Sequence, residues 1–375
     1  MEKINKFLEK KPNITLVNGF TLKKNEIIIE EMKVTIKDLA EKAGVSKTAV
    51  SFAFNNPKRI SEETYKKIMK IAKEIGYSPD PVARILATKQ TGTIGVLFPQ
   101  AVSEVLQNPY ISDLIRGIGT VCDKEGLALT LLSPMKGILN NTIQNAAVDG
   151  MIILGVDKDS SVHSAFKMRN MPYVAIDAKC NAEYINVGID DRSMAESLMD
   201  VLLDNGHEKI LFCALKPIAL DLAEPDQSTT IDERQKGIQD SMRKHNLKEN
   251  TLDSYTFIES ETSFESSYRI AKQILQSEDR PTAIYCMGDI QAFGFYKAAA
   301  ELDINIPEDL SVVSFDDLPV SGILYPELTA IHQPGYEKGV AATEILVKRI
   351  AGEDCKSVRL NANIVKRSSV APAKK

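Results

Sequence analysis

Two different repeats of apolar and polar positions divide the chain near residue 92. From Val34 to Tyr77, apolar residues recur every three or four positions in three short segments, a spacing typical of amphipathic helices. After Gly92, short apolar runs alternate with longer amphipathic segments, which is the pattern of parallel strands joined by helices. The sequence therefore predicts a small helical domain followed by an α/β region.

The second region contains eight apolar runs that we interpret as strands. They are Thr93–Phe98, Ala128–Leu132, Gly150–Leu154, Tyr173–Asp177, Lys209–Ala214, Ser254–Ile258, Ala283–Cys286 and Ser311–Phe315. Two sheets fit this number better than one, and the run Asn186–Asp190 before a helix at Ser193–Leu203 marks a crossing between two lobes. A return crossing is expected near His332–Gly335. Because ligands of open parallel sheets bind beyond the carboxyl ends of the strands, two facing lobes predict a ligand cleft.

The expected fold class is α/β, with a small all-α domain followed by two doubly wound parallel-sheet lobes. We place an N-terminal extension of unknown role at 1–32, the helical domain at 33–79, a hinge helix and linker at 80–91, and the two-lobed domain at 92–375. Within that domain, lobe 1 comprises about 92–189 and 333–361, and lobe 2 comprises about 190–332 and 362–375.

The composition is that of an ordinary globular protein, with 43% hydrophobic and 26% charged residues. No apolar stretch approaches the ~18–20 residues of a membrane span, and no signal-peptide core is present, so a cytoplasmic protein is expected. The cysteines are scattered and have neither C-x-x-C spacing nor a histidine at ligand distance, which favours reduced thiols without a metal or cofactor. They are Cys122, Cys180, Cys213, Cys286 and Cys355.

The charge is unevenly distributed, although the net charge of the chain is only −5. Residues 33–91 carry 12 Lys and Arg against 6 Asp and Glu, whereas the residues after 91 carry 28 against 40. A basic N-terminal domain on an acidic body indicates that only the former contacts a polyanion such as DNA.

The segment Val34–Asn55 predicts a helix-turn-helix. Thr35 can cap a first helix, and Asp38 at its third helical position completes a capping pattern. Gly44 supplies a turn in which a β-carbon would be costly, and Ser46 can cap a second helix. The inner positions of the two helices are Ile36, Leu39, Ala40, Ala43, Ala49, Val50 and Ala53. A third helix begins after Ser61, and its core stripe is Ile68, Ile71, Ala72 and Ile75. A purely structural helical hairpin is the alternative interpretation.

The outward face of the second helix is polar and lies near a helix N-terminus, as in helices that enter the major groove. Lys47 and Thr48 are candidates for reading bases. The short side chains of Thr35, Ser51 and Asn55 suit phosphate oxygens, and each could alternatively be a plain cap or a solvated residue. The candidate DNA contacts of this domain are Thr35, Ser46, Lys47, Thr48, Ser51, Phe52 and Asn55.

Ordered motifs over about residues 33–370 resemble the lactose/galactose repressor family. They include V-T-I-K-D-L-A-E-K-A-G-V-S, G-Y-S-P with A-R-I-L, D-G-M-I-I-L, and P-E-D-L-S-V-V-S-F-D-D with L-T-A-I-H-Q-P. The resemblance implies a helix-turn-helix domain joined to a sensor of periplasmic-binding-protein type. It also implies a sequence-specific transcription regulator, by default a repressor, that binds a palindromic operator as a homodimer or tetramer. A small-molecule effector, a sugar or a sugar derivative, would control it from the interlobe cleft.

The resemblance also assigns a hinge helix that forms on DNA and inserts a leucine into the minor groove. The matching residues here are Ala83 and Leu86, and a helix of roughly seven residues is marginal on its own. Leu86 could instead be a linker residue packed on the sensor. Two positions depart from the family: Phe52 replaces a basic residue, and Asp80 replaces the usual Asn at the start of the hinge. The operator sequence therefore does not transfer from relatives.

Polar side chains at strand ends are the candidates for effector contacts. The carboxylates that follow predicted strands are Asp177, Asp289 and Asp316. Such carboxylates accept hydrogen bonds from the hydroxyl groups of a ligand, and Arg234 could donate a fork of hydrogen bonds to the same ligand. The family resemblance places effector contacts at Tyr110, Asp177, Arg234 and Asp316. Each could instead cap a helix or form an ion pair, and Gly288, where the family usually has Asn, removes one polar contact.

An enzyme is not expected, because the chain has no phosphate-binding loop, no G-x-S-x-G elbow and no H-E-x-x-H motif. The histidines are isolated, and His207 is interpreted as structural. A solute-binding transport protein would share the two lobes but not the basic helical domain, and a metabolic kinase or isomerase is a third alternative. Induction and corepression by the effector are both compatible with the sequence.

Overall fold

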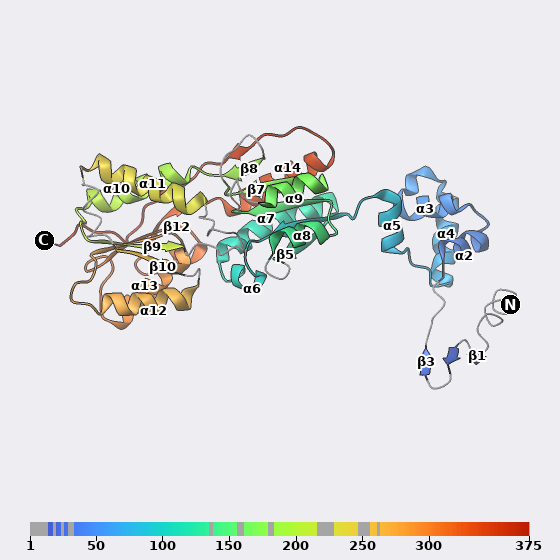
Figure 1. The fold of residues 1–375 in the computed structure, drawn as a ribbon, viewed down its shortest axis with the longest axis horizontal. Helices are drawn as coiled ribbons and strands as arrows, with labels where there is room; N and C mark the ends of the chain where they lie inside the picture. The colour runs from blue at the N-terminus through green and yellow to red at the C-terminus, as the bar shows by residue number, and fades with distance from the viewer. Residues whose placement is uncertain are drawn as a thin grey trace. The chain divides into compact units, whose positions relative to one another are not determined.

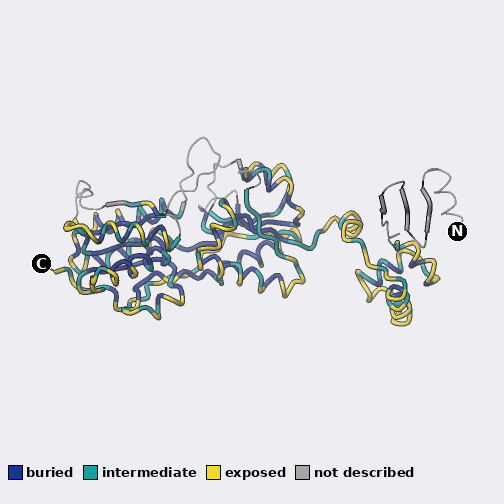
Figure 2. The backbone as a smooth tube through the Cα atoms, turned by 90° about the horizontal axis from the view of Figure 1, so that it is seen from below, coloured by how far each residue is buried: buried dark blue, intermediate teal, exposed yellow. Residues whose placement is uncertain are grey.

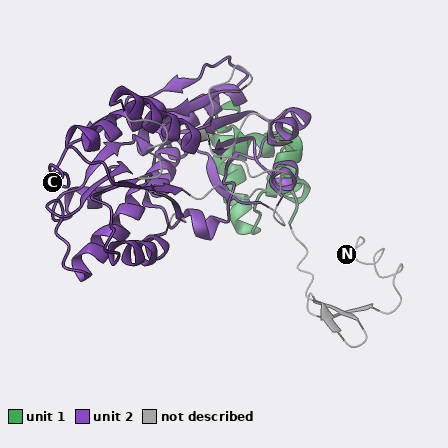
Figure 3. Cartoon of the chain, turned by 60° about the vertical axis from the view of Figure 1, so that its left-hand side comes forward, with its two compact units in different colours: residues 1–89 green, residues 90–375 purple. Residues whose placement is uncertain are grey.

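The computed structural model describes residues 14–17, 20–23, 26–28, 34–134, 138–155, 161–178, 184–215, 229–246, 256–260 and 263–374. The chain divides into two compact units, residues 1–89 and 90–375 (Figure 3). Unit 1 contains the expected helical domain and hinge helix, and unit 2 contains the two large sheets that the sequence predicts. Cys180 lies outside the described residues, as do the first two residues of the strand predicted at Ser254–Ile258.

Unit 1 begins with a small antiparallel sheet in the N-terminal extension, the segment whose role the sequence leaves unknown. Its strands are β1 (Ile14–Val17), β2 (Phe20–Lys23) and β3 (Glu26–Ile28), in the order β1-β2-β3.

The helical domain consists of α2 (Ile36–Ala43), α3 (Lys47–Asn55) and α4 (Glu62–Glu74), with a short 3-10 turn η1 (Pro57–Arg59) between the last two. These helices share one apolar cluster, whose fully buried members include Leu39, Val50 and Ile68. The predicted positions Ile36, Ala49, Ile71 and Ile75 are partly buried against this cluster. The helical period of the sequence therefore predicted the core correctly. The hinge helix α5 (Pro81–Thr88) follows α4.

The first sheet of unit 2, in lobe 1, has the order β14-β8-β7-β6-β4-β5. Its strands, all parallel to their neighbours, are β4 (Thr93–Leu97), β5 (Ala128–Leu132), β6 (Gly150–Leu154), β7 (Tyr173–Ile176), β8 (Asn186–Gly188) and β14 (Val358–Arg359). The helices of this lobe are α6 (Val102–Val105), α7 (Pro109–Glu125), α8 (Leu139–Asn145), α9 (Ser161–Arg169) and α14 (Gly335–Ile350).

The second sheet, in lobe 2, has the order β10-β9-β11-β12-β13-β15 and is parallel except for its last strand. Its strands are β9 (Ile210–Leu215), β10 (Thr256–Ser260), β11 (Ala283–Cys286), β12 (Ser311–Asp316), β13 (Thr329–His332) and β15 (Asn363–Val365). The helices are α10 (Asp191–Asp204), α11 (Thr229–Lys244), α12 (Phe264–Leu275) and α13 (Asp289–Glu301), with a 3-10 turn η3 (Pro319–Gly322).

The chain passes between the two sheets three times, between β8 and α10, between β13 and α14, and between β14 and β15 (Figure 1). Buried residues concentrate along the strands of both lobes (Figure 2). The lobes also share apolar contacts, because Leu318 of lobe 2 belongs to the cluster formed by Phe98, Val105 and Tyr110 of lobe 1. The carboxyl ends of both sheets are thus held close to a common cleft.

All eight predicted strands are confirmed, with ends shifted by up to two residues. The prediction missed β13, β14 and β15, and gave β8 only as part of a crossing. Cys122, Cys213, Cys286 and Cys355 carry free thiols. Within the described ranges, no helix is both long and apolar enough to cross a membrane, and no group of three His, Cys, Asp or Glu side chains is arranged to hold a metal ion.

Candidate functional site

The first candidate surface is the outward face of α3, whose placement follows from local sequence. The predicted capping pair is present, since the Thr35 side chain accepts from the Asp38 amide and Asp38 accepts from the Thr35 amide. Gly44 ends α2 in the left-handed region at φ 63°, where a side chain would be strained. Ser46 then caps α3 by accepting from the Ala49 amide at 3.1 Å. This tight turn leaves Lys47 exposed at the start of α3.

The rest of that face is also accessible. Thr48 is exposed, and Ser51 and Phe52 are half-buried. Asn55, at the end of α3, donates from Nδ2 to the Ser51 hydroxyl at 3.3 Å. The predicted DNA contacts of α3 therefore share one side of the helix, opposite the buried Val50.

A cavity of about 340 Å³ separates the helix-turn-helix from the hinge helix α5. Three predicted phosphate contacts, Thr35, Ser51 and Asn55, line one wall, and Ala83 and Arg84 of α5 line the other. The lining therefore combines hydroxyl, amide and guanidinium donors with the Asp80 carboxylate and with apolar side chains such as Phe54 and Ala87.

The hinge helix α5 is fixed at its N-terminus by Asp80. The Asp80 carboxylate accepts from the Val82 amide at 2.9 Å and from the Ala83 amide at 3.5 Å, and Pro81 occupies the first helical position, where its missing N–H costs nothing. Leu86 is 76% exposed and Val82 is 64% exposed. The helix thus presents two large apolar side chains to solvent.

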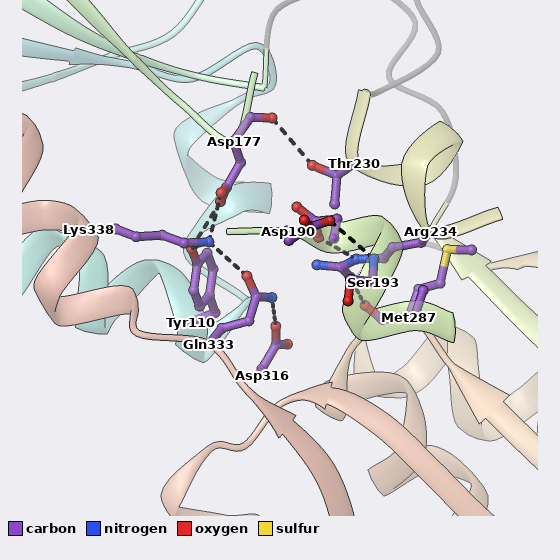
Figure 4. A network of polar contacts seen from close by, with 12 residues as sticks. Tyr110, Asp177, Asp190, Ser193, Thr230, Arg234, Met287, Asp316, Gln333 and Lys338 are labelled. Carbon is purple, nitrogen blue, oxygen red and sulfur yellow. Dashed lines mark hydrogen bonds and ion pairs between the residues drawn. The ribbon is translucent and has the colours of Figure 1, made fainter. Parts of the chain in front are cut away.

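The second candidate surface is a polar network at the carboxyl ends of the two sheets (Figure 4). The Lys338 ammonium, which is fully buried, donates to Asp177 Oδ1 at 2.7 Å and to Tyr110 Oη at 3.1 Å. Its third donor contacts Gln333 Oε1 at 2.8 Å. Gln333 Nε2 in turn donates to Asp316 Oδ1 of lobe 2 at 2.7 Å. Three of the five predicted effector residues therefore belong to one network that joins the lobes.

The position of Lys338 depends on the close approach of α7 and α14. A β-carbon on Gly339 would lie 2.3 Å from the Leu114 carbonyl oxygen, and one on Gly117 would lie 2.1 Å from the Tyr336 carbonyl oxygen. Only glycine permits this contact. It brings the first turn of α14, which carries Lys338, against the first turn of α7, which carries Tyr110.

Arg234, in α11, lies on the lobe 2 side of the cleft and is almost fully buried. Its Nε donates to Asp191 Oδ1 at 2.9 Å, Nη1 donates to the Met287 carbonyl at 2.6 Å, and Cζ lies 3.7 Å from the Phe315 ring centroid. Burial opposes its charged form, but Asp191 and Asp316 together raise the pKa of Arg234. The guanidinium is therefore held charged and fixed in its plane.

A second cavity, of about 300 Å³, lies beside this network. Asp177, Asp190 and Asp191 line it together with Thr230 and Glu233. The Thr230 hydroxyl donates to the Asp177 carbonyl at 3.3 Å, a further contact between lobe 2 and lobe 1. Four carboxylates thus line a cavity that both lobes border, together with apolar side chains such as Ile189 and Val358. Of the five predicted effector residues, Asp177 alone lines it.

Two strand-end carboxylates have unusual backbone conformations. Asp177 has φ 56° and Asp316 has φ 104°, in a region that residues with a β-carbon rarely adopt. Burial is the main cause that raises the pKa of Asp316. Such local strain is found where the surrounding structure holds a side chain in place for a function.

Asp289 does not take the position that we expected for an effector contact. It is fully buried, and its carboxylate accepts from the hydroxyls of Ser314 and Ser321 and from the Leu318 amide at 2.7 Å. Burial first, and the Asp316 carboxylate second, raise the pKa of Asp289 to about 7. The reason for the difference is that three internal donors surround its two oxygen atoms, so Asp289 fixes the loop after β12 from inside lobe 2.

His207 is structural, as predicted. It is buried, its Nδ1 contacts the Thr282 hydroxyl at 3.0 Å, and its Nε2 contacts the Ser311 hydroxyl at 3.0 Å. Its Nε2 also lies 3.0 Å from the Ala371 carbonyl, so the ring ties the C-terminal segment to lobe 2.

Comparison with known proteins decides the family. Residues 35–80 match the model for bacterial regulatory proteins of the lacI family, and residues 199–370 match a periplasmic binding protein-like domain. The HTH-type transcriptional repressor PurR of Vibrio vulnificus is 31% identical over 328 residues, which cover 85% of this chain and 93% of that repressor. The chain belongs to the LacI family. It is a DNA-binding transcription regulator with an effector-binding domain, and its relatives are not enzymes.

Other LacI-family members agree with this assignment. PurR of Klebsiella pneumoniae is 30% identical over 348 residues, covering 90% of this chain and 97% of that repressor. A lac repressor dimer bound to operator and the anti-inducer ONPF has a TM-score of 0.75 at 24% identity, covering 90% of this chain and 99% of that one. At that identity, the likeness shows the fold alone. A ribose-bound LacI-family regulator from Enterococcus faecium has a TM-score of 0.63 at 25% identity, covering 75% of this chain and all of that one.

Sequence reasoning missed Lys338 and Gln333 of the interlobe network, and it missed Asp191, the ion-pair partner of Arg234. A lysine in the first turn of a helix is usually interpreted as solvated. One signal was available, because Lys338 lies on the apolar stripe of α14 that continues at Ala342 and Ile345. A lysine on such a stripe needs a buried partner, here Asp177.

Proposed function

We propose that this LacI-family regulator represses transcription as a homodimer on a two-fold symmetric operator, under control of a small polar effector bound between its lobes. The observation that carries the proposal is the occurrence, in one chain, of a basic helix-turn-helix domain with an exposed recognition helix and of a polar network that links two sheet lobes. A solute-binding protein would need only the second, and a constitutive DNA-binding protein only the first.

In this proposal α3 enters the major groove. Lys47 and Thr48 read base edges, and the N-terminus of α3 at Ser46 faces the DNA backbone. Thr35, Ser51 and Asn55 contact phosphate oxygens, which fixes the register of the helix without reading sequence. Phe52 contacts an apolar base edge such as a thymine methyl group, or supports a neighbouring side chain.

The hinge helix acts in the minor groove. Ala83 provides a small surface on which two hinge helices of a dimer can pack, and the exposed Leu86 is inserted between base steps. Insertion of an apolar wedge kinks the duplex at the cost of unstacking. Burial of Leu86 between bases would replace its contact with water, which favours the DNA-bound state.

The effector is proposed to contact Tyr110, Asp177, Arg234 and Asp316, and Asp289 is proposed to act by positioning the loop after β12. A sugar or a sugar derivative fits these carboxylate, phenol and guanidinium groups, since each can accept from or donate to hydroxyls. Structures of related fold include a complex of the regulator CelR with cellobiose and the ribose-bound regulator from E. faecium. Both of these complexes contain a sugar, which supports this ligand class.

Dimerisation is proposed to use the sensor lobes. On lobe 2, Ile323 is 80% exposed, Tyr325 is fully exposed and Val320 is 42% exposed. These neighbouring apolar side chains suit an interface in which the same patch meets itself across a two-fold axis. A dimer would also place two recognition helices on the two halves of a palindromic operator.

Control then follows from linkage. An effector that binds one arrangement of the lobes more tightly shifts the dimer toward that arrangement. The free energy of DNA binding then changes by the coupling free energy between the two sites, typically ~1–3 kcal/mol. The network from Lys338 to Asp316 is the element that such a ligand would rearrange, because it bonds lobe 1 to lobe 2 at the proposed site.

The proposal can be tested with an operator selected by the wild-type protein from fragments of its own genome. Lys47→Ala and Leu86→Ala are expected to abolish specific binding at concentrations that saturate the wild type, because one removes a base contact and the other the minor-groove wedge. Lys297→Ala, an exposed lysine of lobe 2, is the control. All variants should retain the wild-type thermal shift with any sugar that stabilises the protein. Operator protection by either variant at wild-type concentrations would show that its residue is wrongly assigned.

A further inference from the structure

The recognition helix has less charge than its proposed task requires. Of the nine residues from Lys47 to Asn55, only Lys47 is charged, and the helix has no basic residue in its last turn. Phe52 occupies the outward face one turn further along and is half-buried. A helix that reads bases with Lys47 and Thr48 alone would contact few donors and acceptors in the groove.

A second cation lies beside this face, supplied by the turn that follows α3. The backbone turns back at Asn56, whose amide donates to the Phe52 carbonyl at 2.8 Å, and continues into η1. Arg59, the last residue of η1, is exposed, and its guanidinium carbon lies over the Phe52 ring at 5.2 Å from the centroid. In the described residues of unit 1, no acidic side chain lies within ion-pair distance of Arg59.

The stack on Phe52 determines what the guanidinium can do. An arginine over an aromatic face keeps its charge, loses part of its conformational freedom before binding, and leaves the N–H donors at its edge open. Those donors match the paired O6 and N7 acceptors of guanine in the major groove, the commonest specific contact of arginine with DNA. Lys58, its exposed neighbour in the same turn, has no such stack and would act as a point charge.

We propose that Arg59, held over the ring of Phe52, reads a guanine of the operator beside the bases contacted by α3. Phe52 is then the positioning residue and Arg59 the specificity-determining one. The inference rests on the proposed entry of α3 into the major groove. It assigns a function to Phe52, which stands where the family usually has a basic residue. The positive charge at this place would come from Arg59 in the next turn, held by the Phe52 ring.

The test uses the full-length protein and an operator selected from a random double-stranded DNA library by the wild type. Affinities are measured for this operator, for every single-base-pair change in it, and at several salt concentrations. Arg59→Ala is expected to weaken operator binding about 5- to 100-fold and to abolish the preference for G·C at one position in each half-site. Arg59→Lys should keep the wild-type salt dependence and reduce that preference, because the charge remains and the planar fork is lost.

Two further variants separate base reading from charge alone. Lys58→Ala is the matched control and should weaken all sequences about equally, without relaxing any position. Phe52→Leu should relax the same G·C position as Arg59→Ala, and should cause no further loss when it is added to Arg59→Ala, since a positioning residue acts only through the residue it holds. A melting temperature close to that of the wild type verifies that Phe52→Leu leaves the domain folded.

Failure of this inference can be distinguished from failure of the proposed function. If the wild type selects no DNA sequence, the proposed function is wrong. If it selects an operator but Arg59→Ala weakens every sequence equally and lowers the salt dependence by about one charge, Arg59 contacts a phosphate and the inference is overturned. Additive losses from Phe52→Leu and Arg59→Ala would likewise overturn the positioning role of the ring.

Discussion

At the scale of single residues, the feature that most constrains function is the buried ion pair of the cleft. Lys338 is fully enclosed, and its ammonium has all three donors satisfied by Asp177, Tyr110 and Gln333. A buried charge is tolerated only when it is paired and hydrogen-bonded, so each partner depends on the others. Asp177 is therefore both a predicted effector contact and the counter-ion of a lysine that the sequence did not single out.

Removal of the lysine should expose this dependence. Lys338→Met keeps most of the side-chain volume but leaves Asp177 without its cation, and we expect a loss of about 2–4 kcal/mol in the free energy of unfolding. The measurement is urea denaturation near pH 7. Lys297→Met, which breaks an exposed ion pair with Glu301, is the control and should cost less than about 1 kcal/mol. Adding Asp177→Asn to Lys338→Met should restore part of the loss, and equal losses in the two lysine variants would refute the account of the pair.

Asp289 allows a separate test through pH. The pKa of Asp289 in the folded protein is about 7, above its usual value of 3.8. Between these two pH values, the carboxyl keeps its proton in the folded state and has lost it in the unfolded state. The stability that Asp289 contributes is therefore complete below about pH 4 and is lost as the pH rises through about 7. We expect the wild type to lose more stability than Asp289→Asn between pH 5 and pH 8. Parallel stability curves for the two proteins over this range would disprove the raised pKa.

At the scale of elements, the helix-turn-helix was predictable because its signals are local. The Thr35 and Asp38 pair, Gly44 and Ser46 are each sufficient to fix a helix end, and all are used as expected. The eight predicted strands are long apolar runs. By contrast, β14 has two residues and β15 has three, and both are exposed or half-buried, so neither shows a periodic pattern.

The cleft was only partly predictable from the sequence. Aspartates at strand ends indicated Asp177 and Asp316, because strand ends of parallel sheets converge. Lys338 and Gln333 come from a helix and a crossing that reach the cleft only through tertiary packing of α7 on α14. Asp289 looked equivalent to Asp316, but the donors that bury it, on Ser314, Leu318 and Ser321, lie 25 to 32 residues away in sequence.

The hinge helix is the element whose stability matters most to the proposed function. It has eight residues, too few to be stable alone in water, so its cap at Asp80 contributes a large share of its stability. Asp80→Ala is expected to lower operator affinity about fivefold, which corresponds to a cap worth about 1 kcal/mol. Asp80→Asn keeps the cap and is the control. Operator affinities measured at fixed salt should rank wild type and Asp80→Asn above Asp80→Ala, and an unchanged affinity for the alanine variant would contradict a role for the folded hinge.

At the scale of the whole molecule, the proposed function needs two copies of the chain. An apolar patch formed by Val320, Ile323 and Tyr325 is exposed on lobe 2, and water contact with such side chains is unfavourable. Ile323→Asp combined with Tyr325→Asp should convert the dimer to a monomer at micromolar concentration, because the two charges would be buried in the interface. Sedimentation measures the mass directly. Met168→Asp, an exposed apolar position on α9 of lobe 1, is the control and should remain dimeric.

The central claim is that a basic helical domain binds duplex DNA under control of a cleft between the two lobes of an acidic domain. The most direct test is the affinity of the full-length wild-type protein for genomic DNA fragments over a range of salt concentrations, with and without each metabolite that stabilises the protein against heat. The account predicts at least one fragment whose affinity falls steeply with salt and changes fivefold or more when a stabilising metabolite is added. Affinity that is equal for all fragments and insensitive to every stabilising metabolite would contradict it.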